Sequence, residues 1–229
     1  MPIKLYDLTG REDRRFSPNC WRTRMALAHK GLAHEAVPTR FTQIASIANG
    51  FQVTLPVIED GGRVVADSWA IAQYLENHYP DHPTLFGGEQ GMRLTLFVQN
   101  WVTTVLHAGL IYMIILDIHD HLQPEDKDDF RASREKRFGA SLESLQAGRD
   151  DRLKLFRSSL PPLRSMVQDK PYLGGEMPLY ADYLVFGAFQ WSRVVSPFRL
   201  LDTDDPVLKW FGRCLNLYDG LGRSTPGYD

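Results

Sequence analysis

A serine at a predicted strand–helix corner is the residue with the clearest chemical potential in this 229-residue chain. Ser17 precedes Pro18, a pair typical of a helix start, because serine caps free backbone N–H groups and proline fits the first turn. Residues 3–8 alternate like a β-strand. A hydroxyl at such a corner lies beside the positive end of a helix dipole, where a thiolate is stabilised. The pattern indicates either a plain helix cap or a site that ionises a thiol.

A proline at the entrance of another predicted strand is the second chemical signal. Pro56 opens the apolar run 55–59, and a strand edge tolerates proline because no N–H is needed there. If the Leu55–Pro56 bond is cis, the backbone N–H and C=O of Leu55 turn outward and can pair with an extended peptide. An ordinary trans bond is the alternative that the sequence leaves open.

An acidic residue and a serine begin the next predicted helix. The hydroxyl of Ser68 and the amides that follow it suit a carboxylate, and Asp67 can meet an ammonium group. Together the two residues fit the head group of an amino acid, although either residue alone is an ordinary helix cap.

The predicted elements fall into two groups on either side of a linker. Up to residue 85 the order is β-α-β-α-β-β-α, the size of a thioredoxin-like domain. Proline and glycine are frequent between residues 79 and 88, which indicates the linker. Beyond it the sequence predicts only helices, over residues 90–122, 125–146, 159–168, 180–195 and 206–218. We therefore predict an α/β plus all-α fold, with an N-terminal thioredoxin-like domain over 1–85 and a helical-bundle domain over 89–229.

Composition narrows the classes of partner. A formal net charge of −2 supplies no basic field, so we do not expect nucleic acid as a partner. The longest apolar run, Leu110 to Leu116, is far shorter than a membrane span. Two cysteines, Cys20 and Cys214, form no disulfide framework and suit a reducing compartment. We expect a cytoplasmic protein with no membrane partner.

The serine corner, the strand proline and the Asp-Ser pair, in this order and followed by a helical half, resemble the cytosolic glutathione transferases. The resemblance covers nearly the whole chain. Three segments of the helical half, residues 133–135, 146–153 and 219–223, resemble more narrowly the bacterial β-etherase branch and related fungal transferases.

The resemblance assigns the cysteinyl residue of glutathione to the serine corner and the strand proline. Ser17 would donate a hydrogen bond to the thiol of glutathione and lower the pKa of that thiol, with Asn19 as a second candidate. Leu55, before the matching Pro56, would bind the cysteinyl backbone of glutathione.

The two ends of glutathione are assigned in the same way. Asp67 and Ser68 would bind the γ-glutamyl end. The glycyl carboxylate needs a cation or an amide donor, and Arg40 and Gln52 are the candidates by position. The resemblance implies no metal.

The function implied is transfer of glutathione to an aromatic electrophile held by the helical domain, in a homodimer. The β-etherase branch suggests cleavage of a β-aryl ether beside a ketone. The long helix over 90–122 is expected to face the first domain. The sequence does not settle which of six of its residues belong to the core and which line the pocket: Trp101, Leu106, His107, Leu110, Tyr112 and Met113. A different class of function is a protein that keeps the glutathione site only to bind and carry aromatic ligands.

Three other patterns have simpler interpretations. Ser17 to Cys20 matches a thiol–disulfide motif whose first cysteine is replaced, and we expect Cys20 to be buried and inert. The charged segment 10–15 is expected to be a solvated loop from which one arginine lines the mouth of the site. Leu179 stands where a helix capping box needs a polar side chain. We therefore expect only the half of the box that Asp182 supplies.

Overall fold

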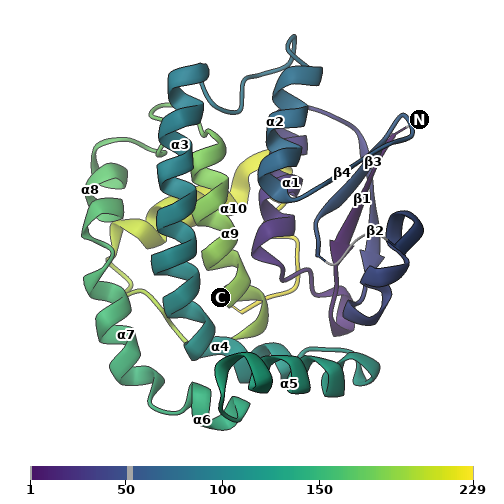
Figure 1. Ribbon diagram of the computed structural model, residues 1–229. Helices are drawn as coiled ribbons and strands as arrows, with labels where there is room; N and C mark the ends of the chain where they lie inside the picture. Colours follow the sequence, from purple (N-terminus) through teal and green to yellow (C-terminus); the bar gives the residue numbers. More distant parts are fainter. Residues whose placement is uncertain (1, 51–53, 229) are drawn as a thin grey trace.

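A four-stranded mixed sheet forms the centre of the N-terminal half (Figure 1). The computed structural model describes residues 2–50 and 54–228. The strand order is β2-β1-β3-β4, with β1 and β2 parallel and the other neighbours antiparallel. The strands are β1 (Ile3–Leu8), β2 (His34–Thr39), β3 (Val57–Asp60) and β4 (Arg63–Ala66). A parallel pair needs a long crossover, which α1 (Pro18–His29) supplies.

Two helices and two 3₁₀ segments complete this half. Helix α2 (Ser68–His78) packs against β3, β4 and α1. The short segments are η1 (Arg11–Asp13) and η2 (Phe41–Gly50). The thioredoxin-like prediction for the N-terminal half is therefore confirmed.

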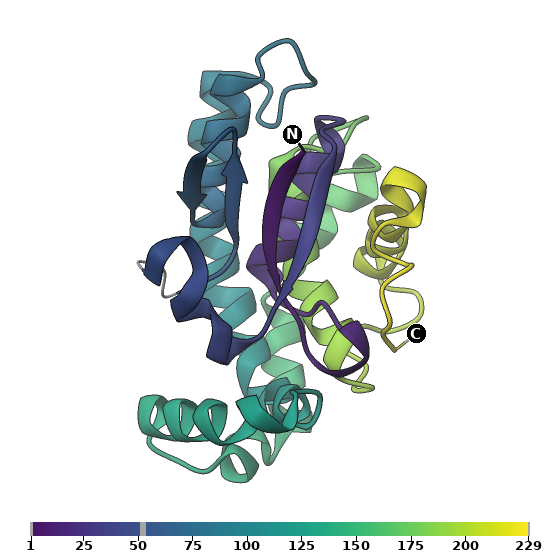
Figure 2. The same cartoon turned by 90° about the vertical axis from the view of Figure 1, so that its right-hand side faces the viewer.

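The rest of the chain is helical, as predicted. The elements are α3 (Glu89–Trp101), η3 (Val102–His107), α4 (Ala108–Asp120), α5 (Pro124–Phe138), α6 (Leu142–Gln146), α7 (Arg149–Ser158), α8 (Pro161–Asp169), α9 (Tyr180–Val195) and α10 (Pro206–Gly220). Figure 2 shows α5 and α6 beneath the rest of the molecule, at the end of the sheet from which η2 emerges. The exact boundary between the two domains stays a prediction.

Two helix boundaries differ from the prediction. The helix predicted over 125–146 is broken, because Gly139 adopts a left-handed φ of 73° and ends α5. Helix α7 was not predicted, since its sequence is mostly charged and Phe156 is its one buried residue among those described. The apolar face of such a helix is too narrow for its apolar residues to show a clear helical period in the sequence.

The long helix Glu89–Asp120 packs into the core of the helical half through its second part, η3 and α4. Its length and apolar composition alone would allow it to cross a membrane. In this fold, however, Leu106, Leu110 and Met113 are fully buried in the hydrophobic core. The apolar composition of this part of the helix is thus explained by packing within the protein.

A close contact between α1 and α9 fixes the position of the serine corner. A Cβ atom at Gly187 would lie 2.4 Å from the carbonyl oxygen of Pro18, so only glycine allows this approach. Trp21, on the next turn of α1, packs edge-on against Phe186 at 5.7 Å between ring centroids. The N-terminus of α1 is therefore held against the core helix of the other half.

The start of α9 has half of a capping box, as expected. The carboxylate of Asp182 accepts a hydrogen bond from the backbone N–H of Leu179 at 3.0 Å, whereas Leu179 has no polar side chain to return one. Asp182 is fully buried and also accepts from the N–H groups of Leu173 and Gly174 and from Trp210 Nε1. This single carboxylate therefore joins the preceding turn, α9 and α10.

Candidate active site

Ser17 is both a helix cap and part of a cleft. Its Oγ accepts a hydrogen bond from the backbone N–H of Cys20 at 3.3 Å, which confirms the cap. The side chain is 6% exposed and borders the cleft between the two halves. The contact with Cys20 uses a lone pair of the hydroxyl and not its proton, so the O–H can still donate to a ligand. The two interpretations of Ser17 are therefore compatible.

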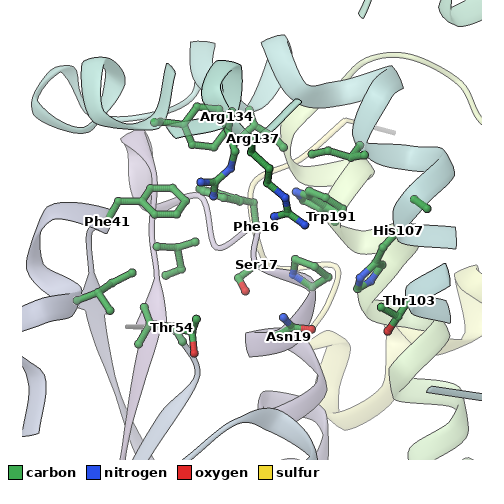
Figure 3. A pocket seen from close by; sticks show the side chains of 18 of the residues that line it. Phe16, Ser17, Asn19, Phe41, Thr54, Thr103, His107, Arg134, Arg137 and Trp191 are labelled. Atoms are coloured by element: carbon green, nitrogen blue, oxygen red, sulfur yellow. The ribbon is translucent and has the colours of Figure 1, made fainter. Parts of the chain in front are cut away.

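The cleft has a volume of about 940 Å³ and is walled by elements of both halves. Figure 3 shows Ser17 and Asn19 at one end of α1, facing side chains that come from η2, η3, α5 and α9. Much of the lining is aromatic, and the rings belong to Phe16, Phe41, Tyr112, Phe130, Phe138 and Trp191. Of the long-helix residues that the sequence left unsorted, His107 and Tyr112 line this cleft.

The strand entrance at Pro56 has the conformation that could expose a backbone edge to a peptide. The Leu55–Pro56 bond is cis, one of the two alternatives left open by the sequence. Leu55 lines the same cleft as Ser17. The carbonyl oxygen of Pro56 accepts a hydrogen bond of 3.2 Å from the backbone N–H of Asp67, which ties the strand entrance to the start of α2.

The pair at the start of α2 lies outside the lining of the cleft itself. The carboxylate of Asp67 accepts hydrogen bonds from the N–H groups of Trp69 and Ala70 at 2.9 and 3.0 Å. Asp67 has a φ of 76°, a left-handed conformation that is uncommon for a residue other than glycine and frequent at functional turns. Ser68 is buried, and its carbonyl oxygen accepts from Tyr180 at 2.7 Å. A carboxylate site at this helix end stays a prediction.

The two residues predicted for the glycyl carboxylate do not gain support from the geometry. Arg40 is half-buried and forms an ion pair with Glu125 of α5, at 3.4 Å between Nη1 and Oε2. Gln52 lies outside the described residues.

Contacts next to Arg40 join η2 to α5 and close one side of the cleft. Asp126 accepts hydrogen bonds from the backbone N–H and the hydroxyl of Thr42, at 3.0 and 2.9 Å. The rings of Phe41 and Phe130 pack at 5.6 Å between centroids. These contacts fix the position of α5 above the N-terminus of α1.

A buried arginine and a histidine at the cleft were not predicted as a pair. Arg22 is 4% exposed and its Nη2 lies 3.4 Å from Nε2 of His107. Arginine can only donate, so Nε2 is the acceptor and the imidazole proton resides on Nδ1. Burial, and then the charge of Arg22, lower the pKa of His107 to about 3. His107 is thus neutral at physiological pH and faces the cleft beside Trp191, at 5.6 Å between ring centroids.

The depressed pKa of His107 predicts a loss of stability in acid. The folded state disfavours protonated His107, whereas the unfolded chain binds that proton near its usual pKa of ~6.5. Stability from this residue is therefore present above pH ~6.5 and falls by up to ~1.4 kcal/mol per pH unit as pH decreases toward the folded pKa. Urea unfolding of the native chain and His107→Gln between pH 7 and pH 5 tests this. Parallel pH dependences in the two proteins would contradict it.

Cys20 is buried, as expected. Its side chain has no solvent exposure, and Cys214 is equally buried. Desolvation, followed by the charge of Asp7, raises the pKa of the Cys20 thiol far above its usual value. A thiol that is inaccessible and protonated cannot serve as a redox nucleophile. Disulfide exchange at Cys20 is therefore disfavoured.

The charged segment before Ser17 is solvated only in part, because Arg11, Glu12 and Asp13 are exposed whereas its later arginines are not. Arg15 is buried and forms ion pairs with Asp7 and Asp13, at 3.1 and 2.6 Å. Arg14 donates to the carbonyl oxygen of Val194 on α9 at 2.8 Å. Arg11 donates to the carbonyl oxygen of Asp120 at 2.6 Å, and none of the three arginines of the segment lines the cleft. The expectation that one of them lines the mouth was wrong.

The cationic side chains at the cleft come instead from α5. Arg134 and Arg137 both line it, and Figure 3 shows them extending from α5 toward Ser17 and Trp191. The sequence contained one sign of this, since residues 133–135 were among the segments of narrow resemblance. Their contact with the serine corner depends on how α5 crosses the molecule, which no local pattern reveals.

Comparison with known proteins identifies the class to which this fold and cleft belong. Residues 13–83 match the sequence profile of the N-terminal domain of glutathione S-transferases, and residues 94–214 match that of the C-terminal domain. The chain therefore belongs to the glutathione S-transferase family.

Fungal and plant proteins are among the relatives. A glutathione S-transferase of Ceriporiopsis subvermispora, solved in complex with glutathione, is 26% identical, with 99% of each chain covered and a TM-score of 0.85. Glutathione transferase GSTFuA3 of Phanerochaete chrysosporium is 28% identical over 96% of this chain and 92% of that one, with a TM-score of 0.77. A zeta-class glutathione S-transferase of Euphorbia esula is 28% identical over 58% of this chain, and the match spans 62% of that protein's length.

Proposed function

We propose that this protein is a glutathione transferase that ionises the glutathione thiol at Ser17 and directs it at an aromatic electrophile. The observation that carries the proposal is the position of the Ser17 hydroxyl, at the N-terminus of α1 and on the floor of a cleft lined by aromatic rings. A helix N-terminus and a hydroxyl donor both favour a thiolate. The aromatic lining favours an aromatic second substrate.

Glutathione would extend along the cis-proline strand toward the start of α2. Leu55 and Pro56 would bind its cysteinyl backbone, and Asp67 with Ser68 its γ-glutamyl group, which carries both an ammonium and a carboxylate. Membership of the family and the glutathione complex of the fungal relative support this assignment. Arg40 and Gln52 stay the candidates for the glycyl carboxylate, and Arg40 would have to exchange its ion pair with Glu125 for that carboxylate.

The reaction is nucleophilic displacement at carbon. The thiolate attacks, a C–S bond forms, and the leaving group departs with the electrons of its bond. With a β-aryl ether ketone the bond that breaks is C–O, and the phenolate released takes a proton from water. Holding both reactants in one cleft supplies proximity, and Ser17 supplies thiol activation.

We also propose a cytoplasmic homodimer, by resemblance to the family. Leu94 and Phe97 on α3 are 72% and 74% exposed, which is a high exposure for large apolar side chains and suits a covered face. Sedimentation velocity tests the dimer: the expected mass is twice 26.2 kDa, and replacing both residues by serine is expected to give monomers. A monomeric native protein at micromolar concentration would contradict it.

Two electrophiles that share a phenacyl group test the reaction. Phenacyl bromide reports displacement of a good leaving group, and phenacyl phenyl ether reports ether cleavage through release of phenol. We expect glutathione-dependent turnover of the bromide above the uncatalysed rate, and of the ether if the narrower resemblance is correct. Glutathione binding without turnover of either compound would favour the ligand-carrier alternative.

A further inference from the structure

The charge of the cleft is positive and uncompensated. Arg134 and Arg137 line it, and no Asp or Glu does so within the described part of the chain. Neither arginine forms an ion pair with a described carboxylate, in contrast to their neighbour Arg131. Arg131, on the same helix, binds Glu135 and Glu143, each at 2.9 Å. Glu135 and Glu143 are thus paired with Arg131 and not with the two cleft arginines.

Aromatic rings hold both cleft arginines in place. The guanidinium carbon of Arg134 lies 4.7 Å from the ring centroid of Phe130 and 5.7 Å from that of Phe41. The guanidinium carbon of Arg137 lies 5.3 Å from the ring centroid of Phe138. Ring faces attract and orient a cation but leave its positive charge in place.

The charged form of Arg134 is disfavoured at this position. Burial, followed by the charge of Arg137, lowers the pKa of Arg134. A guanidinium partly removed from water and close to a second one gains most from an anion, which it can bind with two parallel hydrogen bonds. The cleft therefore combines two guanidinium groups that can bind an anion with aromatic walls that can pack against a ring.

We infer that the second ligand of this cleft is an aromatic carboxylate, whose acid group binds Arg134 and Arg137 while its ring packs among the aromatic side chains beside Trp191. The inference rests on the proposed function and narrows its electrophile to an acidic aromatic compound. Figure 3 shows both guanidinium groups on the side of the cleft facing Ser17, so a ligand bound there lies next to the thiol. In this account the two arginines bind and orient the substrate, while Ser17 activates the nucleophile.

Cinnamate and cinnamamide form a matched pair of probes, because they share a ring and chain and differ in charge. Isothermal titration of each is carried out on the native chain, on Arg134→Gln/Arg137→Gln, and on Arg131→Gln as the control from the same helix. We expect the native protein to bind cinnamate about tenfold more tightly than cinnamamide, a preference typical of an Arg–carboxylate contact in a partly buried site. The double variant is expected to lose the preference, and Arg131→Gln to keep it.

Glutathione is titrated separately, so that the two proposals are tested independently. Equal binding of cinnamate and cinnamamide by the native protein, or no binding of cinnamate, would overturn the inference whatever glutathione does. A loss of glutathione affinity in the double variant would also overturn it, since the arginines would then serve the carboxylates of glutathione. Failure of the native protein to bind glutathione, with the cinnamate preference intact, would instead overturn the proposed function.

Discussion

Replacing Ser17 by alanine is expected to lower the rate of glutathione conjugation about tenfold or more at pH 7, with little change in the Kd for glutathione. A thiol with the ordinary pKa of ~8.5 is only a few per cent ionised at pH 7, so losing one to two units of pKa depression removes most of the thiolate. The Kd is retained because the peptide backbone and the γ-glutamyl group of glutathione make their contacts elsewhere. Steady-state kinetics with phenacyl bromide, together with titration of glutathione, measure both quantities.

The defect of Ser17→Ala should also depend on pH. Above pH ~8.5 glutathione ionises without help, so the variant is expected to approach the native rate there. Ser17→Thr keeps a hydroxyl and is the matched control, and Asn19→Ala tests the second candidate for thiol activation. A rate in Ser17→Ala equal to the native rate at pH 7 would remove Ser17 from the mechanism, and a large defect in Asn19→Ala would then transfer the role to Asn19.

Replacing Asp182 by alanine is expected to destabilise the fold by about 3 kcal/mol or more. The carboxylate is fully buried and accepts four hydrogen bonds, from Leu173, Gly174, Leu179 and Trp210. Alanine leaves all these donors without a partner in the interior, and a buried donor without a partner costs about 1–3 kcal/mol. Urea unfolding followed by tryptophan fluorescence measures the change.

Asp202→Ala is the matched control for this prediction, because it removes an aspartate from the surface. Asp202 forms an ion pair with Arg157 at 2.9 Å, but its side chain is 64% exposed. Exposed pairs contribute about 0–1 kcal/mol, so a small change is expected. A similar small change in Asp182→Ala would show that the donors find water or rearrange, and that Asp182 is not the anchor of α9.

Local sequence signals predicted the N-terminal half well. Ser17 followed by Pro18 identified the start of α1, and Asp67 identified the start of α2, because capping residues act within one turn of the helix that they begin. The apolar run over residues 55–59 likewise indicated β3 from local sequence alone. The thioredoxin-like fold, and membership of the glutathione S-transferase family, followed from the order of these signals.

The side chains that line the far wall of the cleft could not be predicted. Arg134 and Arg137 lie on a highly charged helix whose exposed and cleft-facing residues look alike in the sequence. Their position depends on the contacts between Asp126 and Thr42 and between the rings of Phe130 and Phe41, which join segments far apart in the chain. The buried Arg15 was misjudged for the same reason, since its partner Asp7 lies on β1.

Ultraviolet titration of the thiolate of glutathione bound to the native protein tests the central claim most directly. The absorbance of the bound thiolate, followed from pH 5 to pH 10, gives the pKa of the thiol without any choice of electrophile. We expect a pKa about one to two units below the ordinary ~8.5, and a return toward that value in Ser17→Ala. A bound thiol that titrates near 8.5 in both proteins would contradict thiol activation at Ser17.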